Sequence, residues 1–271
     1  MGTAAKRIAR DTYMLTDTLL GVSQFLLLGG ERALLIDTGY GKKSLLKKVK
    51  KLTSLPLVVV NTHLHPDHSN GNKFFEEVLL GEGDLPERGI PSNDMVASLC
   101  AAYRESSPLL RPLVGKLEKL YTVVTGEERY SPLGASIDLG GRVVRRIDCP
   151  GHTEGSVIFA DEKEKLLFTG DAIGRAQWLF TDAASTTTGY AERWERLSPS
   201  LISYREMWIS HSRKPLEIGF IEGFVAALRD VNPENCKKIK LKGAEEPILV
   251  HVGKYGGAGK ITVWAFPGQV R

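Results

Sequence analysis

The stretch NTHLHPDHSNGN, Asn61 to Asn72, places three histidines and one aspartate within six positions, directly after the apolar run LPLVVV. Imidazole nitrogens and carboxylate oxygens are ligands that suit zinc, manganese and iron. A loop that follows a buried strand can bring several such side chains to one point. The stretch therefore predicts a metal site at the end of a β-strand.

The order of residues within this stretch predicts more than one metal ion. His63 and His65 lie two positions apart, so they can project from the same side of an extended backbone and chelate one ion. Pro66 turns the chain, which directs Asp67 and His68 elsewhere, toward a second ion. A role in capping the next helix would explain a single histidine. It does not explain half of the protein's six histidines in one turn.

Two later segments each offer one more ligand at the end of a strand. DCPGHTEGS presents His152 on a glycine-flanked turn, and LLFTGDA ends a strand at Gly170 and presents Asp171. Either residue alone is compatible with an ordinary turn or a helix cap. Together with the His-rich stretch, they supply the remaining ligands of a metal site.

These motifs, THLHPDH, PGHTEGS and FTGDA in this order and at these separations, resemble the signature of the metallo-β-lactamase superfamily. That signature is HxHxDH followed by a lone His, a lone Asp and a last His. The resemblance runs from about Tyr13 to Val231 and includes the LLIDTG segment with Asp37. It implies an α+β fold, a four-layer αββα sandwich of two mixed β-sheets flanked by helices.

The resemblance also implies a dinuclear centre of two divalent metal ions, with zinc as the first choice and manganese or iron as alternatives. The first ion would bind three imidazoles, those of His63, His65 and His152. The second would bind a carboxylate and two imidazoles, those of Asp67, His68 and a last histidine. Asp171 would bridge the two ions.

Two histidines compete for the place of the last ligand. His211, in WISHSRKPLE, precedes a helical segment at 218–231, as the final ligand of the family does. The family commonly has glycines on both sides of it, whereas this chain has Ser210 and Ser212. His251, in ILVHVG, lies in an apolar strand, where a packed histidine is the commoner case. We expect His211 to be the ligand and keep His251 as the alternative.

The rest of the chain predicts one domain over residues 1–271. Apolar runs bounded by glycine predict strands in two halves, with amphipathic helices between and after them. A helical and loop insertion is expected at about 92–130, and a C-terminal β-hairpin extension at about 245–267. The stretch after Asp171, AIGRAQWLFTDAASTTTGYAERW, is expected to be irregular.

Composition and charge disfavour a nucleic-acid or membrane partner. The net charge of +4 is mildly basic, and the dense lysines of CKKIKLK are typical of the solvent face of a strand, so we expect no nucleic-acid partner. No stretch reaches the ~20 apolar residues that a membrane helix needs. The amino end has no apolar core of a secretory signal, and three scattered cysteines predict no disulfide framework, so we expect a cytoplasmic protein. A homo-oligomer is compatible with the sequence.

The predicted chemistry is metal-assisted hydrolysis. Two cations that share a water lower its pKa toward neutrality and polarise the bond under attack. We expect a metal-bridging hydroxide to attack a small-molecule ester, thioester, lactone or lactam-type bond, with Asp67 as the catalytic carboxylate that orients it or moves a proton. Trp178, Phe180 and Tyr190 are candidates for a substrate pocket, and core packing is the other explanation for them.

Two other activities remain open at this point. A mononuclear iron oxidoreductase resembling persulfide dioxygenases would use the same HxHxDH pattern but only one metal triad. A nuclease of the same superfamily would generally carry a second domain, for which 271 residues leave little room. The tail predicts a hairpin instead of the C-terminal helical domain of glyoxalase II, which counts against that specific activity.

Overall fold

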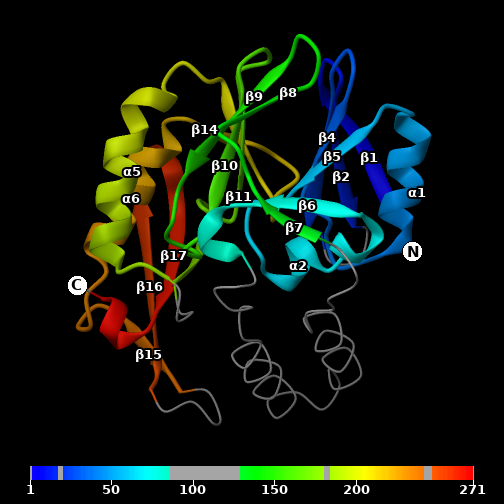
Figure 1. The fold of residues 1–271 in the computed structure, drawn as a ribbon. Coiled ribbons are helices and arrows are strands. Elements are labelled where there is room, and N and C mark those ends of the chain that lie inside the picture. Colours follow the sequence, from blue (N-terminus) through cyan, green and yellow to red (C-terminus); the bar gives the residue numbers. More distant parts are fainter. Residues whose placement is uncertain (1, 18–20, 86–128, 180–183, 241–245, 271) are drawn as a thin grey trace.

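Two mixed β-sheets face each other at the centre of the molecule, and helices cover their outer faces (Figure 1). The computed structural model describes residues 2–17, 21–85, 129–179, 184–240 and 246–270. The predicted α+β sandwich is confirmed. Most of the insertion expected at 92–130 lies outside the described residues.

The first sheet has seven strands in the order β1-β2-β3-β4-β5-β6-β7. Strands β1 to β4 pair antiparallel, and β4 to β7 pair parallel. Its strands are β1 (Thr3–Ala9), β2 (Thr12–Asp17), β3 (Ser23–Leu28), β4 (Ala33–Ile36), β5 (Leu57–Val60), β6 (Glu77–Leu80) and β7 (Arg129–Pro132). The central strands read ALLI and LVVV without alternation because both faces of this part of the sheet are covered.

The second sheet has six strands in the order β14-β13-β11-β10-β9-β8, and only β11 and β13 are parallel. Its strands are β8 (Ser136–Asp138), β9 (Val143–Asp148), β10 (Val157–Asp161), β11 (Leu166–Gly170), β13 (Glu206–Ile209) and β14 (Leu216–Glu217). Phe25 of the first sheet meets Phe168 of the second with ring centroids 4.9 Å apart. Burying each ring stabilises the fold by roughly 1.5–3 kcal/mol.

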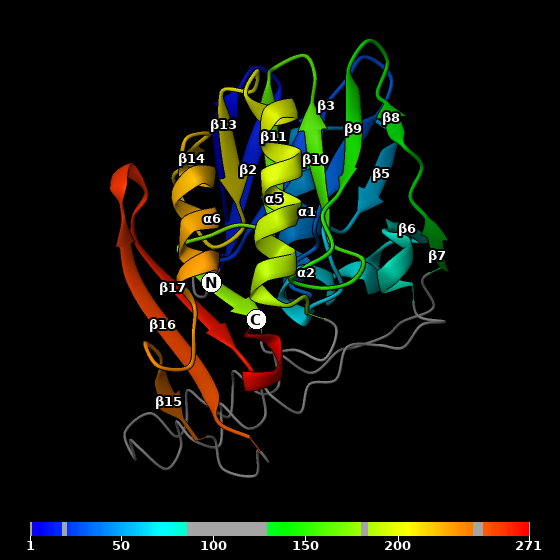
Figure 2. The same ribbon diagram turned by 90° about the vertical axis from the view of Figure 1, so that its left-hand side faces the viewer.

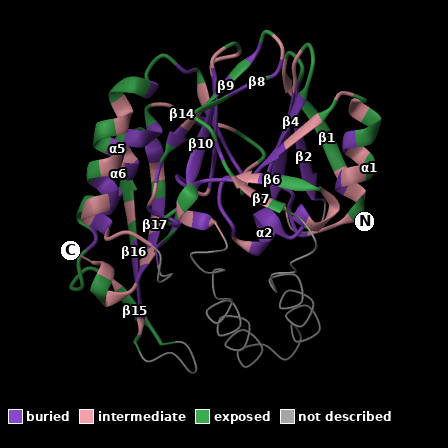
Figure 3. Ribbon diagram, in the orientation of Figure 1, coloured by how far each residue is buried: buried purple, intermediate pink, exposed green. Residues whose placement is uncertain are grey.

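Helices complete the outer layers. Helix α1 (Lys43–Leu52) buries Leu45 and Val49 against the first sheet and turns its lysines to solvent. Helices α5 (Thr187–Leu201) and α6 (Phe220–Asp230) lie side by side over the second sheet (Figure 2). Colouring by burial shows that central strands such as β4 and β10 are buried, whereas the edge strands β1 and β8 are largely exposed (Figure 3). No helix in the described ranges is long and apolar enough to cross a membrane.

A third sheet was not predicted from the sequence. Strands β16 (Ile248–Tyr255) and β17 (Gly259–Ala265) form an antiparallel hairpin around the short helix η5 (Gly256–Ala258), and β15 (Lys237–Ile239) pairs with β16. Strand β12 (Ala176–Leu179) pairs parallel with β17. The expectation of an irregular segment over 172–194 is therefore wrong at β12, and it is also wrong from residue 187 onward, where helix α5 begins. Its partner lies far along the chain, so no local pattern reveals the pairing.

Short helices complete the described elements. They are α2 (Pro66–Ser69), η1 (Asn72–Phe74), η2 (Glu82–Asp84) and η6 (Pro267–Gln269). Helix α2 begins one residue after His65, with Pro66 at its first position, where a missing N–H is tolerated.

Candidate metal centre

The predicted ligands lie at the ends of strands from both sheets. His63 and His65 occupy the loop between β5 and α2, and Asp67 and His68 lie on α2 itself. Three further residues come from the second sheet, each after a strand: His152 after β9, Asp171 after β11 and His211 after β13. Gly170 permits the close approach of the two sheets here, because a Cβ on it would lie 2.3 Å from Thr62 Oγ1.

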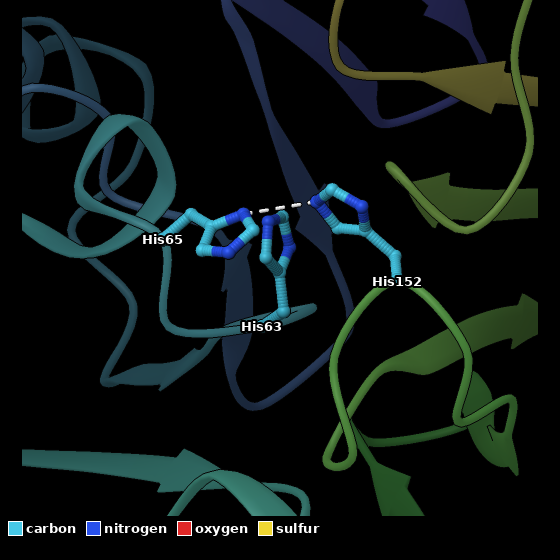
Figure 4. Close-up of side chains that lie close together, drawn as sticks. All are labelled: His63, His65 and His152. Atoms are coloured by element: carbon cyan, nitrogen blue, oxygen red, sulfur yellow. Dashed lines mark hydrogen bonds between the residues drawn. The ribbon is translucent and has the colours of Figure 1, made fainter. Parts of the chain in front are cut away.

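Three histidines form the first cluster. His63, His65 and His152 each offer a nitrogen, and these atoms lie within 4.8 Å of one another. Figure 4 shows the three rings converging, two from the β5 loop and one from the loop after β9. His65 Nδ1 lies 2.9 Å from His152 Nε2. Three converging imidazoles match the ligand set of catalytic zinc sites.

Two carboxylates and two imidazoles form the second cluster. The Nε2 atom of His211 lies 3.0 Å from Asp171 Oδ2 and 3.2 Å from Asp67 Oδ2. The Nε2 atom of His68 lies 3.4 Å from Asp171 Oδ2 and 3.5 Å from Asp67 Oδ2. His68 is fully buried, whereas 45% of the His211 side chain is exposed, so the cluster reaches solvent at His211.

Asp171 joins the two clusters. Its Oδ2 atom contacts both histidines of the second cluster and lies 3.9 Å from His152 Nε2 of the first. A single carboxylate in this position can bind two neighbouring ions.

Two buried imidazole nitrogens without hydrogen bonds indicate that the clusters suit metal ions. The Nε2 atoms of His63 and His68 are buried and form no hydrogen bond within the described structure. Leaving a buried polar atom unpaired costs about 1–3 kcal/mol. Both atoms point into their clusters, where a metal bond would satisfy them. One set of three nitrogens and one mixed set of nitrogens and oxygens therefore fit two divalent ions.

A second layer of hydrogen bonds orients the histidines. His68 Nδ1 donates to Asp37 Oδ2 over 2.8 Å, and His152 Nδ1 donates to the carbonyl oxygen of Trp178 over 2.8 Å. Each bond places the ring proton on Nδ1 and leaves the Nε2 lone pair free for a metal. Asp37 also accepts from the Thr62 amide at 2.7 Å, so it holds the loop and the ligand together.

Comparison with known proteins identifies the family. The sequence profile of the metallo-beta-lactamase superfamily matches residues 17–207. This chain belongs to the metallo-β-lactamase superfamily. A metallo-beta-lactamase family protein from Thermus thermophilus shares the fold, with a TM-score of 0.59, 21% identity, and coverage of 82% of this chain and 79% of that chain.

Curated relatives of this superfamily member include two kinds of thioester hydrolase. The chain is 31% identical over 159 residues to "Acyl-coenzyme A thioesterase MBLAC2" of Gallus gallus, a match that covers 55% of this chain and 56% of the relative. It is 28% identical over 145 residues to "Hydroxyacylglutathione hydrolase" of Hyphomonas neptunium, which covers 54% of this chain and 44% of the relative. The chain thus spans about half the length of these two relatives. Family membership assigns the metallo-β-lactamase fold to the chain.

Electrostatics differ between the two clusters of this superfamily site. Burial and neighbouring His152 lower the pKa of His65 to about 3, while burial and the surrounding histidines hold the pKa of His63 well below its usual value. In the second cluster burial acts in the same direction, but Asp67 and Asp171 outweigh it and raise the pKa of His68. The first cluster therefore offers neutral imidazoles, the form that binds metals.

Asp84 is a supporting residue that the sequence did not reveal. Its carboxylate accepts from the Leu64 amide at 2.9 Å, the Thr153 hydroxyl at 3.0 Å and the Gly155 amide at 2.8 Å. Leu64 lies between two ligands, and Thr153 follows His152. Asp84 thus ties together the two loops of the first cluster, although its sequence context, GEGDLP, resembles an ordinary turn.

The three residues expected in a substrate pocket differ in where they lie. Tyr190 is fully buried, and its hydroxyl donates to the carbonyl of Ala172, so its placement in a substrate pocket is corrected to the core. Its ring supports the turn that carries His152, because a Cβ on Gly151 would lie 1.9 Å from it. Trp178 is 37% exposed beside that turn. Phe180 lies outside the described residues.

Among the described residues, the structure groups His211, and not His251, with the other ligands. His251 is buried in the third sheet, where its Nδ1 lies 3.0 Å from Asn235 Oδ1 and its Nε2 lies 2.5 Å from the Tyr255 hydroxyl. Both of its ring nitrogens have protein partners there, which explains a histidine in an apolar strand.

Proposed function

We propose that the protein hydrolyses a small-molecule thioester with two divalent metal ions, zinc being the first choice. One observation supports two ions most directly: two complete ligand clusters lie side by side and share contact with Asp171. A mononuclear iron oxidoreductase would need only one triad of two histidines and a carboxylate, and would leave the other ligands of the two clusters without a role.

The choice of a thioester is supported by the relatives. An acyl-coenzyme A thioesterase and a hydroxyacylglutathione hydrolase act on different carriers, yet both names describe a bond between an acyl group and a thiol. Because their matches cover about half of each relative, the substrate is a proposal for this chain.

The residues of the chain would divide the work as follows. The three imidazoles of the first cluster, those of His63, His65 and His152, would hold one ion, and Asp67, His68 and His211 the other, with Asp171 between them. When bound, the two ions supply activated water and polarise the thioester carbonyl. Asp37 and the Trp178 carbonyl keep the ring protons of His68 and His152 away from the centre.

We assign the transfer of the reaction's proton to Asp67. Its Oδ2 lies 3.2 Å from His211 Nε2, at the side of the centre that reaches solvent. Hydrolysis converts the thioester and one water into a carboxylate, a thiol and a proton. A thiol with a pKa of about 8.5 leaves more easily than an alcohol, so Asp67 need only accept or relay the proton that the attacking water releases.

The test is a substrate panel on metal-loaded protein. We expect hydrolysis of acyl-coenzyme A and acyl-glutathione thioesters to exceed that of matched oxygen esters, lactones and β-lactams. His65→Ala should lower thioester hydrolysis by more than the ~100-fold that loss of a supporting partner can cost. His251→Ala is the control, because it removes a histidine that is buried but lies outside both clusters. If the wild-type protein hydrolysed thioesters no faster than His65→Ala does, the proposal would be excluded.

A further inference from the structure

The outer face of the third sheet starts beside a metal ligand. Trp178 of β12 accepts the hydrogen bond from His152 through its backbone carbonyl, and its side chain points away from the core. In the register of the sheet, Trp178 lies opposite Trp264, Trp264 opposite Val250, and Val250 opposite Lys237. Residues directly opposite each other share a face, so this row leads from the metal centre across the sheet, with Val250 buried in its middle.

The part of this row nearest the metal centre is aromatic. The rings of Trp178 and Trp264 lie with centroids 6.5 Å apart and planes tilted by 54°. In the next row, Val252 lies opposite Thr262 and is 47% exposed. Trp178 is exposed and Trp264 is half-buried, and tryptophan rings beside a reaction centre offer flat surfaces on which a ring can stack and along which an apolar chain can lie.

The charged Lys, Arg, Asp and Glu side chains in the strands of this sheet are all positive. The strands AQWL, KKI, ILVHVGKY and GKITVWA contain four lysines and no aspartate or glutamate. Lys254 and Lys260 are exposed, lie directly opposite each other on the outer face, and form no ion pair with any described residue. Like charges in opposite positions destabilise a strand pair, whereas an anion between them would remove the repulsion.

We propose that this face binds the carrier part of the thioester, and that the carrier is a phosphorylated, nucleotide-bearing thiol such as coenzyme A, in preference to glutathione. The inference rests on the proposed thioester hydrolysis. The thioester would lie at the metal centre and the thiol arm would cross Trp178. The base would stack on Trp264, and the phosphates would meet lysines at the margin of the face.

Dimensions of the sheet agree with a long carrier. Three strand spacings of about 4.8 Å put Lys237 about 14 Å across the sheet from Trp178. Four residues along β17 put Lys260 about 13 Å from Trp264. Glutathione has neither a ring to stack nor phosphates for the lysines, so this face offers it little.

Direct binding tests the inference without relying on catalysis. The metal-loaded full chain is titrated calorimetrically with coenzyme A and with pantetheine, which has the same thiol arm but lacks the nucleotide. We expect coenzyme A to bind at least about tenfold tighter, a difference that two charge-assisted phosphate contacts can supply. The double variant Lys254→Glu/Lys260→Glu should abolish that preference, and Trp264→Ala should reduce it.

The variants have matched controls. Reversing both lysines keeps a like-charged pair, so the strand pairing is perturbed little, and Lys254→Gln/Lys260→Gln serves if the reversed variant does not fold. Lys47→Glu/Lys51→Glu makes the same charge change at exposed positions of α1, which packs on the first sheet. It should retain the preference for coenzyme A. Equal affinity for coenzyme A and pantetheine in the wild type, or an unchanged preference in the Lys254/Lys260 variant, would overturn the inference.

Kinetics separate this inference from the proposed function. The ratio of kcat/KM for an acyl-coenzyme A to that for the same acyl-glutathione should exceed one and fall at least about tenfold in the Lys254/Lys260 variant, the same factor as in binding. If the wild-type protein binds coenzyme A through these lysines but hydrolyses no thioester, the proposed function is contradicted and carrier binding by this face is supported. If it hydrolyses thioesters with no preference between the carriers, the proposed function is supported and carrier binding by this face is contradicted.

Discussion

Asp171→Asn should lower kcat/KM for thioester hydrolysis by more than the ~100-fold that loss of a supporting partner costs at a metal site. The substitution keeps the shape of the side chain but removes the charge that lies 3.0 Å from His211 Nε2 and 3.4 Å from His68 Nε2. Because the same oxygen lies 3.9 Å from His152, both clusters are affected at once. Steady-state kinetics with a saturating divalent metal measure the effect.

Asp148→Asn is the control for the Asp171 variant. It removes a carboxylate that is 60% exposed and paired with Arg146, at the end of β9 and outside both clusters. Its activity should stay close to that of the wild type. If Asp171→Asn kept kcat/KM within about tenfold of the wild type, a loss smaller than most active-site changes cause, Asp171 would not bridge the centre.

Removing metal should destabilise the protein as well as inactivate it. Without ions, the buried carboxylate of Asp67 and the half-buried one of Asp171 lie in one cluster, and the buried Nε2 atoms of His63 and His68 form no hydrogen bond. A metal ion whose free concentration is a thousand times its Kd stabilises the folded state by about 4 kcal/mol. For a chain of this size, that corresponds to a fall in Tm of roughly 10 °C when a chelator takes it away.

Thermal unfolding with and without a chelator measures this effect, and added zinc should restore both Tm and activity. Asp171→Asn, with its weakened site, should respond less to the chelator than the wild type does. Full activity and an unchanged Tm in protein shown to be free of metal would contradict a metal centre.

Local motifs explain what the sequence predicts well. His63, His65, Asp67 and His68 lie within six positions, so one strand-loop-helix unit determines their placement. The apolar runs of the central strands and the amphipathic pattern of α1 predict the layers of the sandwich for the same reason. Each of these patterns lies within a short stretch of sequence, and the apolar residues in it mark the face of the strand or helix that is buried.

Features that depend on distant pairing are not readable in this way. Strand β12 exists because β17 lies beside it, and Trp264 comes near the metal centre only through that pairing. Asp84 joins the loop of Leu64 to Gly155, which lies 71 positions after Asp84 in the chain. Tyr190 was misplaced because an aromatic side chain near a ligand motif looks the same in sequence whether it lines a pocket or packs beneath a turn.

The metal content of freshly purified protein, measured by plasma mass spectrometry, tests the central claim most directly. The same measurement is made on His211→Ala and His251→Ala. Two ligand clusters predict about two zinc or manganese ions per chain, as in other two-metal hydrolase sites, falling toward one only in the His211 variant. A single iron ion per chain, unaffected by either substitution, would contradict a dinuclear hydrolase and favour the mononuclear oxidoreductase.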